Sequence, residues 1–558
     1  MPNFGMESSA GLSRRAFLTS SALAGLACFA PGLTSAQETT APNVALDDVR
    51  AALRLAGISF TEDELRETLD EIRSSAEAYA EIRTFPIQYK TEPLTRFVPH
   101  GTIADKSPRV RAVPSPVRLP DLAKLSEEDI AFLTISELHG LLKARKITST
   151  ELTRLSLSRL RRYDQKLLCV AHFCSDTALK EAAQADAEIR AGKMRGPLHG
   201  IPYGLKDLFA TKDHPTGWGA EPYRGQMLGE DATVVQLLRS AGAVLVAKLT
   251  LGALAMGDRW YGGMTRNPWN TTQGSSGSSA GSASAVAAGL VSFAIGSETL
   301  GSICSPSLQC RVTGLRPTYG RISRYGAMAL SYTMDKVGPV ARTVEDCALV
   351  FAAICGADPR DPSAVSHSFS WPPRVDPKKL RIGVVLPEKK TFEDYPIFKQ
   401  LVDRGYQFRI AKITPAPEAL GLILSAECAS AFDAFTRGEE IRELKNSYWP
   451  QYFRSARVIP AVEYLQAQRL RTLVAEQLAE EMQEYDLLMT PGIGLQTILL
   501  TNVTGHPQCI IPDGVEANGI PRSWSIIAGL YQESLAMAFA QQLQGLSDYH
   551  QKRPMIPL

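Results

Sequence analysis

A run of small residues constrains this chain more than any other feature. Positions 274–289 read Gly-Ser-Ser-Gly-Ser-Ser-Ala-Gly-Ser-Ala-Ser-Ala-Val-Ala-Ala-Gly, a composition unlike an ordinary apolar core. Glycine lets the backbone come close to its neighbours and adopt conformations closed to other residues. The run therefore predicts tight turns with backbone N–H groups aimed at a bound group, and a small-residue helix at 282–290 that packs closely on its neighbours.

Three polar residues in and around this run are candidates for chemistry. Ser278 lies within it, Ser302 follows in Gly-Ser-Glu-Thr-Leu-Gly-Ser-Ile at 296–303, and Lys206 precedes it in Gly-Ile-Pro-Tyr-Gly-Leu-Lys-Asp at 200–207. Taken singly, each serine is typical of a turn, and the lysine is typical of the solvated end of a strand. Their joint order favours a nucleophile that is assisted by a base.

The composition is that of a large globular protein. Of 558 residues, 44% are hydrophobic, which provides an ample core and argues against disorder. The net charge of +2 gives no basic excess that would indicate a nucleic-acid partner. The cysteine spacings fit no zinc pattern, so no metal is expected. Buried free thiols are favoured over disulfides for the cysteines that follow Cys28.

The first 36 residues resemble a twin-arginine (Tat) export signal. Ser-Arg-Arg-Ala-Phe-Leu at 13–18 precedes an apolar stretch at 22–30, and Thr-Ser-Ala at 34–36 offers small residues for cleavage. This predicts a periplasmic or secreted bacterial protein with no stable membrane insertion after cleavage. A membrane anchor or a chance apolar patch are the alternatives, although the stretch is too short to span a bilayer comfortably. Lipoprotein processing at Cys28 is not favoured.

Two further parts follow the signal. Residues 37–120 are predicted to form an N-terminal helical segment at 43–80, with Thr61 as a helix cap and Glu64 three residues on, and then a Pro-rich extended connector at 84–119. The helical segment either covers the core or mediates a homodimer. Residues 121–558 are predicted to form the catalytic domain.

Helical and strand patterns alternate along that domain. The patterns predict helices at 136–145, 149–163, 178–191 and 461–485, and strands ending at Lys206 and at 241–248, 291–295 and 380–385. Strands that alternate with helices predict an α/β fold, with a large mixed β-sheet core covered by helices on both faces.

The blocks around Lys206, Ser278 and Ser302 resemble the amidase signature family. The similarity extends over about 133–542 and includes Thr-Arg-Asn-Pro-Trp at 265–269, Gly-Leu-Arg-Pro-Thr-Tyr-Gly at 314–320 and Asp-Lys-Val-Gly-Pro at 335–339. The resemblance implies the amidase-signature fold and a Ser–cis-Ser–Lys triad. Ser302 would be the nucleophile, Ser278 would relay its proton across a cis Gly277–Ser278 peptide, and Lys206 would be the base.

The resemblance also implies the rest of the machinery. The oxyanion would be held by the backbone N–H groups of Thr299, Leu300, Gly301 and Ser302. No metal or other cofactor is needed. Lys206 can act as a base only when it is neutral, so burial must lower its pKa from about 10.4. The adjacent Asp207 need not neutralise it, because consecutive strand residues point to opposite faces.

One local motif offers a competing nucleophile. Gly-Ser-Ser-Ala-Gly at 277–281 matches the Gly-x-Ser-x-Gly elbow of α/β-hydrolases, which would make Ser279 the nucleophile. That motif needs a strand immediately before it, whereas residues 267–274 are rich in turn formers. It also needs a histidine, and the histidines downstream are His367, His506 and His550. This interpretation is therefore disfavoured.

The chain departs from the family pattern close to Ser302. Leu300 stands where glycine is usual, which narrows the space beside the oxyanion loop, and Ala280 also replaces a usual glycine. Glu298 replaces a usual aspartate, and Cys304 a usual arginine, which predicts that a structural ion pair is absent. The stretch at 491–501 is shorter than the substrate-facing loop that family members often carry there. These changes leave the triad intact and put any specific substrate in doubt.

The expected activity is hydrolysis of a small or aryl amide, or of a related carbamate or ester. One alternative is a degenerate member that binds a ligand without turnover. Another is a glutamyl-tRNA(Gln) amidotransferase A-like subunit, which the export signal and the balanced charge argue against. Five aromatic residues lie in or near the family blocks: Trp218, Trp260, Tyr261, Tyr325 and Tyr332. We expect them either to line an apolar acyl pocket or to belong to the core.

Overall fold

The computed structural model describes residues 44–87, 110–445, 447–494, 497–516 and 519–556. The predicted export signal and most of the Pro-rich connector lie outside these ranges and stay predictions. No helix in the described ranges combines the length and apolar character that crossing a membrane requires.

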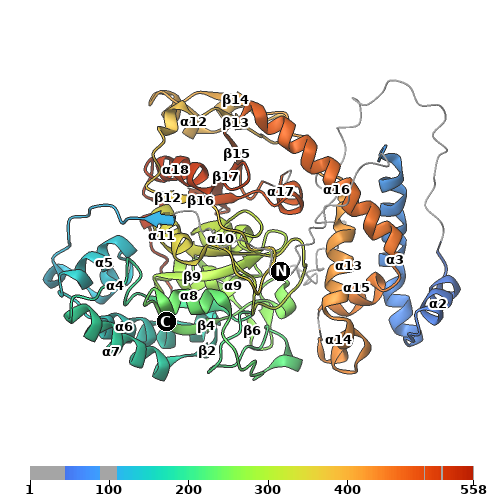
Figure 1. Ribbon diagram of the computed structural model, residues 1–558, viewed down its shortest axis with the longest axis horizontal. Coiled ribbons are helices and arrows are strands. Elements are labelled where there is room, and N and C mark those ends of the chain that lie inside the picture. The colour runs from blue at the N-terminus through green and yellow to red at the C-terminus, as the bar shows by residue number, and fades with distance from the viewer. Residues whose placement is uncertain (1–43, 88–109, 446, 495–496, 517–518, 557–558) are drawn as a thin grey trace, which may run out of the picture.

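An 11-stranded sheet forms the centre of the molecule (Figure 1). Its order is β14-β13-β15-β17-β16-β10-β11-β9-β3-β4-β2. β3 pairs in parallel with β4 and β9, whereas β9 pairs antiparallel with β11, so the sheet is mixed as the sequence predicts. The strands are β2 (Val170–Phe173), β3 (Pro202–Lys206), β4 (Val244–Leu249), β9 (Phe293–Glu298), β10 (Thr313–Arg316), β11 (Lys336–Ala341), β13 (Ile382–Val384), β14 (Phe408–Ile410), β15 (Leu487–Pro491), β16 (Gln508–Val515) and β17 (Pro521–Ala528).

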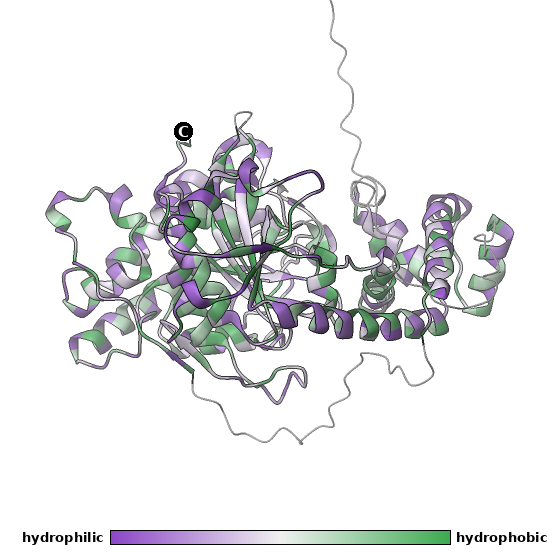
Figure 2. Ribbon diagram, turned by 90° about the horizontal axis from the view of Figure 1, so that it is seen from above, coloured by the Kyte–Doolittle hydropathy of each residue, from purple (hydrophilic) through white to green (hydrophobic). Residues whose placement is uncertain are grey.

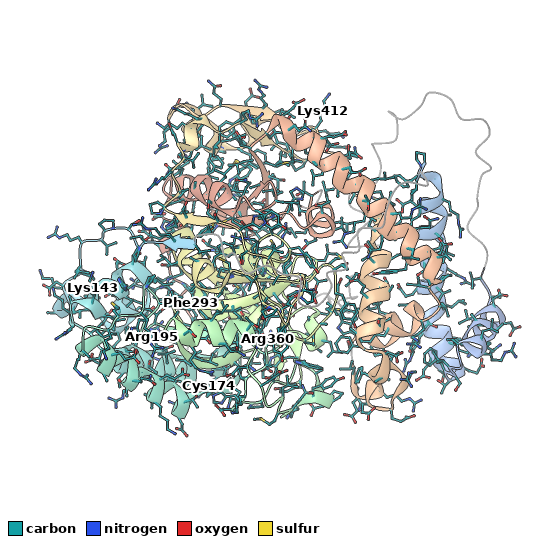
Figure 3. All side chains as sticks on the ribbon, viewed as in Figure 1. Lys143, Cys174, Arg195, Phe293, Arg360 and Lys412 are labelled. Carbon is teal, nitrogen blue, oxygen red and sulfur yellow. The ribbon has the colours of Figure 1, made fainter. Side chains whose placement is uncertain are left out.

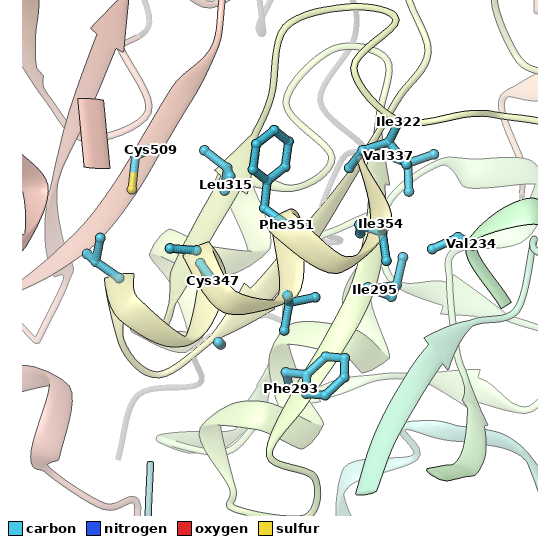
Figure 4. Close-up of a cluster of buried hydrophobic side chains, with 14 of the residues drawn as sticks. Val234, Phe293, Ile295, Leu315, Ile322, Val337, Cys347, Phe351, Ile354 and Cys509 are labelled. Carbon is cyan, nitrogen blue, oxygen red and sulfur yellow. The ribbon is translucent and has the colours of Figure 1, made fainter. Parts of the chain in front are cut away.

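Helices cover both faces of this sheet. Side chains alternate along β9, so Phe293 and Ile295 join one apolar core while Ala294 joins a second one across the sheet. The first core includes Phe351 and Ile354 of α11 (Val344–Ile354), which Figure 4 shows against the same strands. The second core contains residues of α6 (Ser149–Leu167), α7 (Ser175–Arg190) and α9 (Ala280–Ala287). The predicted α/β architecture is confirmed.

The small-residue helix predicted at 282–290 is α9 (Ala280–Ala287), which begins two residues earlier and ends three earlier. All of α9 is buried. A Cβ atom on Gly281 would lie 2.5 Å from the carbonyl oxygen of Cys169 and 2.5 Å from the amide nitrogen of Thr250. The helix can therefore rest directly on the strands only because its residues are so small.

The N-terminal helices pack on other helices rather than on the sheet. They are α2 (Leu46–Leu55) and α3 (Glu62–Thr84), and Thr61 caps α3 through its Oγ1, which accepts a hydrogen bond from the Glu64 amide at 3.3 Å. α3 lies beside the helical layer of α13 (Gly421–Ala431), α15 (Trp449–Ala456) and α16 (Ala461–Glu481), on the right of Figure 1. Glu64 pairs with Arg454 of α15 at 2.7 Å.

Side chains fill the space between these elements. Figure 3 shows Phe293 and Cys174 within the body of the molecule, with Lys143 and Lys412 at its periphery. Hydrophilic and hydrophobic residues alternate along the outer helices in Figure 2, the pattern of helices with one face packed inward. The eight described cysteines are free, and all but Cys355 are fully buried, which confirms the expected thiols.

Candidate active site

Lys206 is the last residue of β3, the third strand from one edge of the sheet, and its side chain is completely buried. Its Nζ lies 2.8 Å from the Oγ of Ser278, 3.2 Å from the Oγ of Ser279 and 2.9 Å from the Oγ of Ser297. Burial lowers the pKa of Lys206 to about 7, although the negative charges of Asp335 and Glu298 oppose the shift. A large fraction of this amine is therefore neutral at physiological pH and can accept a proton.

Asp207 points away from Lys206, as the strand geometry predicts. Its Oδ1 lies 3.0 Å from the Nζ of Lys248 on β4, and its Oδ2 accepts a hydrogen bond from the Gly217 amide at 2.9 Å. Both charged groups are buried. The carboxylate next to the candidate base is thus neutralised by a different lysine.

This buried pair gives a first prediction. Lys248→Met should leave the Asp207 carboxylate buried without its cation and lower the free energy of unfolding by roughly 3–5 kcal/mol. Urea unfolding of the two proteins, followed by circular dichroism, measures the change. Lys212→Met, which alters a surface lysine in the same region, should have little effect. Equal stability of the Lys248 variant and the parent would contradict the assigned pair.

Ser278 is placed by an unusually close approach of two loops. The Gly277–Ser278 peptide is cis, as the family resemblance implies. A Cβ atom on Gly277 would lie 1.9 Å from the carbonyl oxygen of Gly257, so only glycine fits there. The Ser278 side chain is almost fully buried, with its hydroxyl against Lys206.

Ser302 lies on the turn between β9 and α10 (Cys304–Cys310) and is partly exposed. Its carbonyl oxygen accepts a hydrogen bond from the Ser279 amide at 3.0 Å, which ties this turn to the serine-rich loop. The structure therefore brings the three predicted residues into one region, with the buried pair of Lys206 and Ser278 beside an accessible Ser302. Their catalytic roles stay predictions.

The predicted oxyanion segment has free donors. Gly301 adopts a φ of +91°, which favours glycine. No hydrogen bond among the described residues uses the backbone N–H of Leu300, Gly301 or Ser302. Thr299 is fixed by its own hydroxyl, which donates to the Oδ1 of Asp335 at 2.6 Å. These N–H groups are available to a bound oxygen atom.

The expectation that a structural ion pair is absent is wrong. Glu298 is fully buried and pairs with Arg316 of β10 at 2.8 Å. Its other oxygen accepts hydrogen bonds from the amides of Ile303 and Cys304, at 2.8 and 3.0 Å. Burial alone would raise the pKa of Glu298, but Arg316 and these bonds lower it to about 2. An arginine from another strand thus supplies the charge that Cys304 does not, and Glu298 anchors the turn after Ser302.

Ser279, the competing nucleophile, is poorly placed. Its hydroxyl is fully buried and donates to the carbonyl oxygen of Ser297 at 3.1 Å. The strand before it, β8 (Asn270–Gly274), belongs to a two-stranded ribbon with β7 (Arg266–Asn267) rather than to the central sheet. The expectation that no strand precedes the motif is therefore wrong, but this strand is not part of the central sheet on which an α/β-hydrolase elbow is built.

A cavity of about 200 Å³ adjoins this site. Ser297 and Thr299 form part of its wall, which combines apolar residues with five charged ones: Arg324, Asp335, Lys336, Arg360 and Asp361. Of the five aromatic residues considered from the sequence, Tyr325 and Tyr332 line it. Trp218, Trp260 and Tyr261 do not line it: Trp218 packs on Tyr223 and Phe432, and Trp260 on Tyr261.

Two residues beyond the predicted set contribute to the site. Ser297 contacts Lys206, and Asp335 fixes Thr299. Both lie in blocks that carry the family resemblance, but only pairing between β9 and β11 brings them together. No cluster of three or more His, Cys, Asp or Glu side chains suited to a metal occurs in the ranges that the structure describes.

Comparison with known proteins agrees with this arrangement. The amidase family model matches residues 151–511. The chain is 32% identical over 481 residues to the glutamyl-tRNA(Gln) amidotransferase A-type subunit of Methylococcus capsulatus, covering 75% of this chain and 98% of that protein. It is 32% identical over 472 residues to "Putative amidase AmiD" of Mycobacterium bovis, covering 78% and 98%.

A solved structure shares the fold. The native peptide amidase from Stenotrophomonas maltophilia superimposes with a TM-score of 0.65 at 28% identity, covering 76% of this chain and 99% of that one. The family match spans the serine-rich loop, the turn that carries Ser302, and the sheet strands from β2 to β15 with the first residues of β16. The chain therefore belongs to the amidase signature family, and membership of this family implies a hydrolase that acts on carbon–nitrogen bonds.

Proposed function

We propose that this protein is an amidase that hydrolyses a small or aryl carboxamide through an acyl-enzyme on Ser302. The observation that carries the proposal is the buried pair of Lys206 and Ser278, whose polar atoms lie 2.8 Å apart. A lysine with a pKa of about 7 is suited to general-base work near neutral pH. Ser302, partly exposed on the adjoining turn, is the group that can meet a substrate.

The reaction then runs in two halves. The Oγ of Ser302 attacks the amide carbonyl carbon, while its proton passes to Ser278 and the proton of Ser278 passes to the Nζ of Lys206. The N–H groups of the 299–302 segment stabilise the oxyanion. The tetrahedral intermediate collapses as the amine leaves with the relayed proton. Water, deprotonated by the same relay, then attacks the ester and releases the carboxylate.

The neighbouring cavity supports a compact substrate. Its volume of about 200 Å³ suits a short acyl chain or a single ring, and its wall includes Leu208, Val337 and the ring of Tyr325. Apolar walls with a few polar groups are typical of small-molecule sites. We assign this cavity to the acyl group.

A substrate panel tests the proposal. The purified protein is mixed with carboxamides, anilides, carbamates and esters, and release of amine or alcohol is measured. Hydrolysis of at least one carboxamide, with an acyl group on Ser302 found by mass spectrometry of quenched reactions, is expected. Failure to hydrolyse any member, together with failure of a fluorophosphonate to label Ser302, would favour a ligand-binding protein without turnover.

The pH dependence gives a second prediction. Lys206 must be deprotonated to accept the proton, so kcat/KM should rise with pH and level off above a midpoint near 7, the pKa of Lys206. Initial rates between pH 5 and 9 measure the profile. A rate that falls as pH rises through 7 would mean that the protonated amine is the active form.

The second candidate is an amidotransferase A-like subunit, which the 32% identity to the Methylococcus capsulatus protein favours. The two candidate functions differ in whether activity requires partner subunits. An amidase acts alone, so activity of the isolated chain on the panel supports it. If the chain acts only with partner subunits and glutamyl-tRNA(Gln), the alternative holds.

We also propose export of the chain, which cell fractionation tests.

A further inference from the structure

The segment at 330–335 borders the site and is held unusually firmly. Asp335, whose Oδ1 fixes Thr299, uses its Oδ2 to accept hydrogen bonds from the amides of Leu330 and Ser331, at 2.8 and 3.0 Å. Burial raises the pKa of this carboxyl, while the hydrogen bonds to it oppose the shift. The base of the segment is therefore tied to the oxyanion turn.

The helical layer holds the same segment from the other side. Glu427 of α13 accepts hydrogen bonds from the amide and hydroxyl of Thr333, at 3.0 and 2.7 Å, and from the hydroxyl of Ser331. Arg471 of α16 donates to the hydroxyl and the carbonyl oxygen of Thr333, at 2.7 and 2.8 Å. Glu427 and Arg471 are both buried. Two helices distant in sequence thus hold Ser331 and Thr333, the residues on each side of Tyr332.

Tyr332 differs from its surroundings. Its carbonyl oxygen accepts hydrogen bonds from the hydroxyl of Tyr319 at 2.8 Å and from Nη1 of Arg324 at 2.6 Å, so its backbone is fixed as well. Yet 47% of the residue is exposed, although it is large and mostly apolar. A rigid backbone thus carries an aromatic ring that is not packed into the core.

Tyr332 borders two cavities. Tyr332 lines the cavity of about 200 Å³ beside Thr299, and it also lines a second cavity of about 400 Å³ among α13, α15 and α16. The second cavity is walled in part by small apolar residues, Ala426, Ala429 and Ile459. Of its three charged residues, Asp433 and Arg457 pair with each other, and Glu427 is occupied by Ser331 and Thr333. An alkyl chain is compatible with such a wall.

We propose that Tyr332 sets the length of the acyl group that the site accepts, because its ring separates the cavity beside Thr299 from the larger cavity in the helical layer. The inference rests on the proposed amidase function. A short acyl group fits in front of the ring, whereas a longer one meets it. With the ring removed, the two cavities join, and the helical layer receives the end of a longer chain.

Anilides of graded length test this inference. The p-nitroanilides of acetic, butyric, hexanoic, octanoic and decanoic acid are compared on the parent, Tyr332→Ala and Tyr332→Phe. Each methylene that gains an apolar contact changes discrimination by roughly tenfold or more. Tyr332→Ala should therefore raise kcat/KM for octanoyl relative to acetyl anilide at least tenfold. Tyr332→Phe keeps the ring and should keep the parent's profile.

The outcomes are distinguishable. If the parent hydrolyses the short anilides and Tyr332→Ala shows the same length profile, the inference is wrong and the proposed function stands. If the parent hydrolyses no anilide or other amide, both are wrong. If Tyr332→Ala turns over too slowly to measure, labelling rates of Ser302 with ethyl and octyl fluorophosphonates give the same profile, and an unchanged ratio of the two rates overturns the inference.

Discussion

Ser302→Ala should lower kcat/KM for a hydrolysed carboxamide by roughly 10⁴-fold or more, the scale seen when a catalytic serine is removed from a serine hydrolase. The variant lacks the oxygen that forms the acyl-enzyme, while Glu298 and the amide of Ser279 keep the turn in place. Stopped assays with high enzyme concentration measure the residual rate. Thermal unfolding of the variant should match that of the parent.

Ser279→Ala is the matched control for this variant. Ser279 occupies the competing motif and is buried, so its loss should reduce the rate far less than loss of Ser302. A fluorophosphonate should add its mass to the parent and to Ser279→Ala but not to Ser302→Ala. Full activity of Ser302→Ala, or labelling that depends on Ser279, would contradict the assignment of the nucleophile.

Lys206→Met should lower kcat by about 10³-fold, within the range that general-base catalysis contributes. Methionine is close to lysine in shape and tolerates burial, so the fold should persist. Lys206→Arg should lower kcat as well, because a guanidinium stays protonated and cannot accept the proton. Single-turnover rates with an activated ester and with an amide measure the loss for each kind of leaving group.

Comparison with a second buried lysine isolates the role of the base. Lys248→Met also removes a buried amine, but its effect should fall on stability rather than on the chemical step. The midpoint near pH 7 should disappear from the profile of Lys206→Met and remain in that of Lys248→Met. If Lys206→Met keeps both the rate and the midpoint, another group is the base.

The core of the fold could be predicted from the sequence because its patterns are local. Short apolar runs mark β3 and β4, and the small-residue run marks α9, whose packing on Thr250 needs Gly281. The prediction for β9 ended at 295, whereas the strand continues to Glu298. That extension depends on pairing of Glu298 with Lys336 of β11, a long-range contact that local periodicity does not contain.

The candidate site likewise has a part that local sequence blocks predict and a part that depends on long-range contacts. Lys206, Ser278 and Ser302 could be named because contiguous blocks carry them. The partner of Glu298 could not, because Arg316 lies on another strand and only the folded sheet brings the two charges together. Tyr332 was considered as an aromatic residue, but its place between two cavities depends on Glu427 and Arg471, which lie in the helical layer.

The packing of α3 on the helical layer bears on how this protein can be produced and trimmed. Its residues Ala78 and Ile82 share an apolar cluster with Leu470 and Val474 of α16, and Glu64 pairs with Arg454. A recombinant fragment cut to the family match at 151–511 would lose α3 and present this cluster to water. Such a fragment would be prone to aggregation through a surface that the longer chain keeps covered.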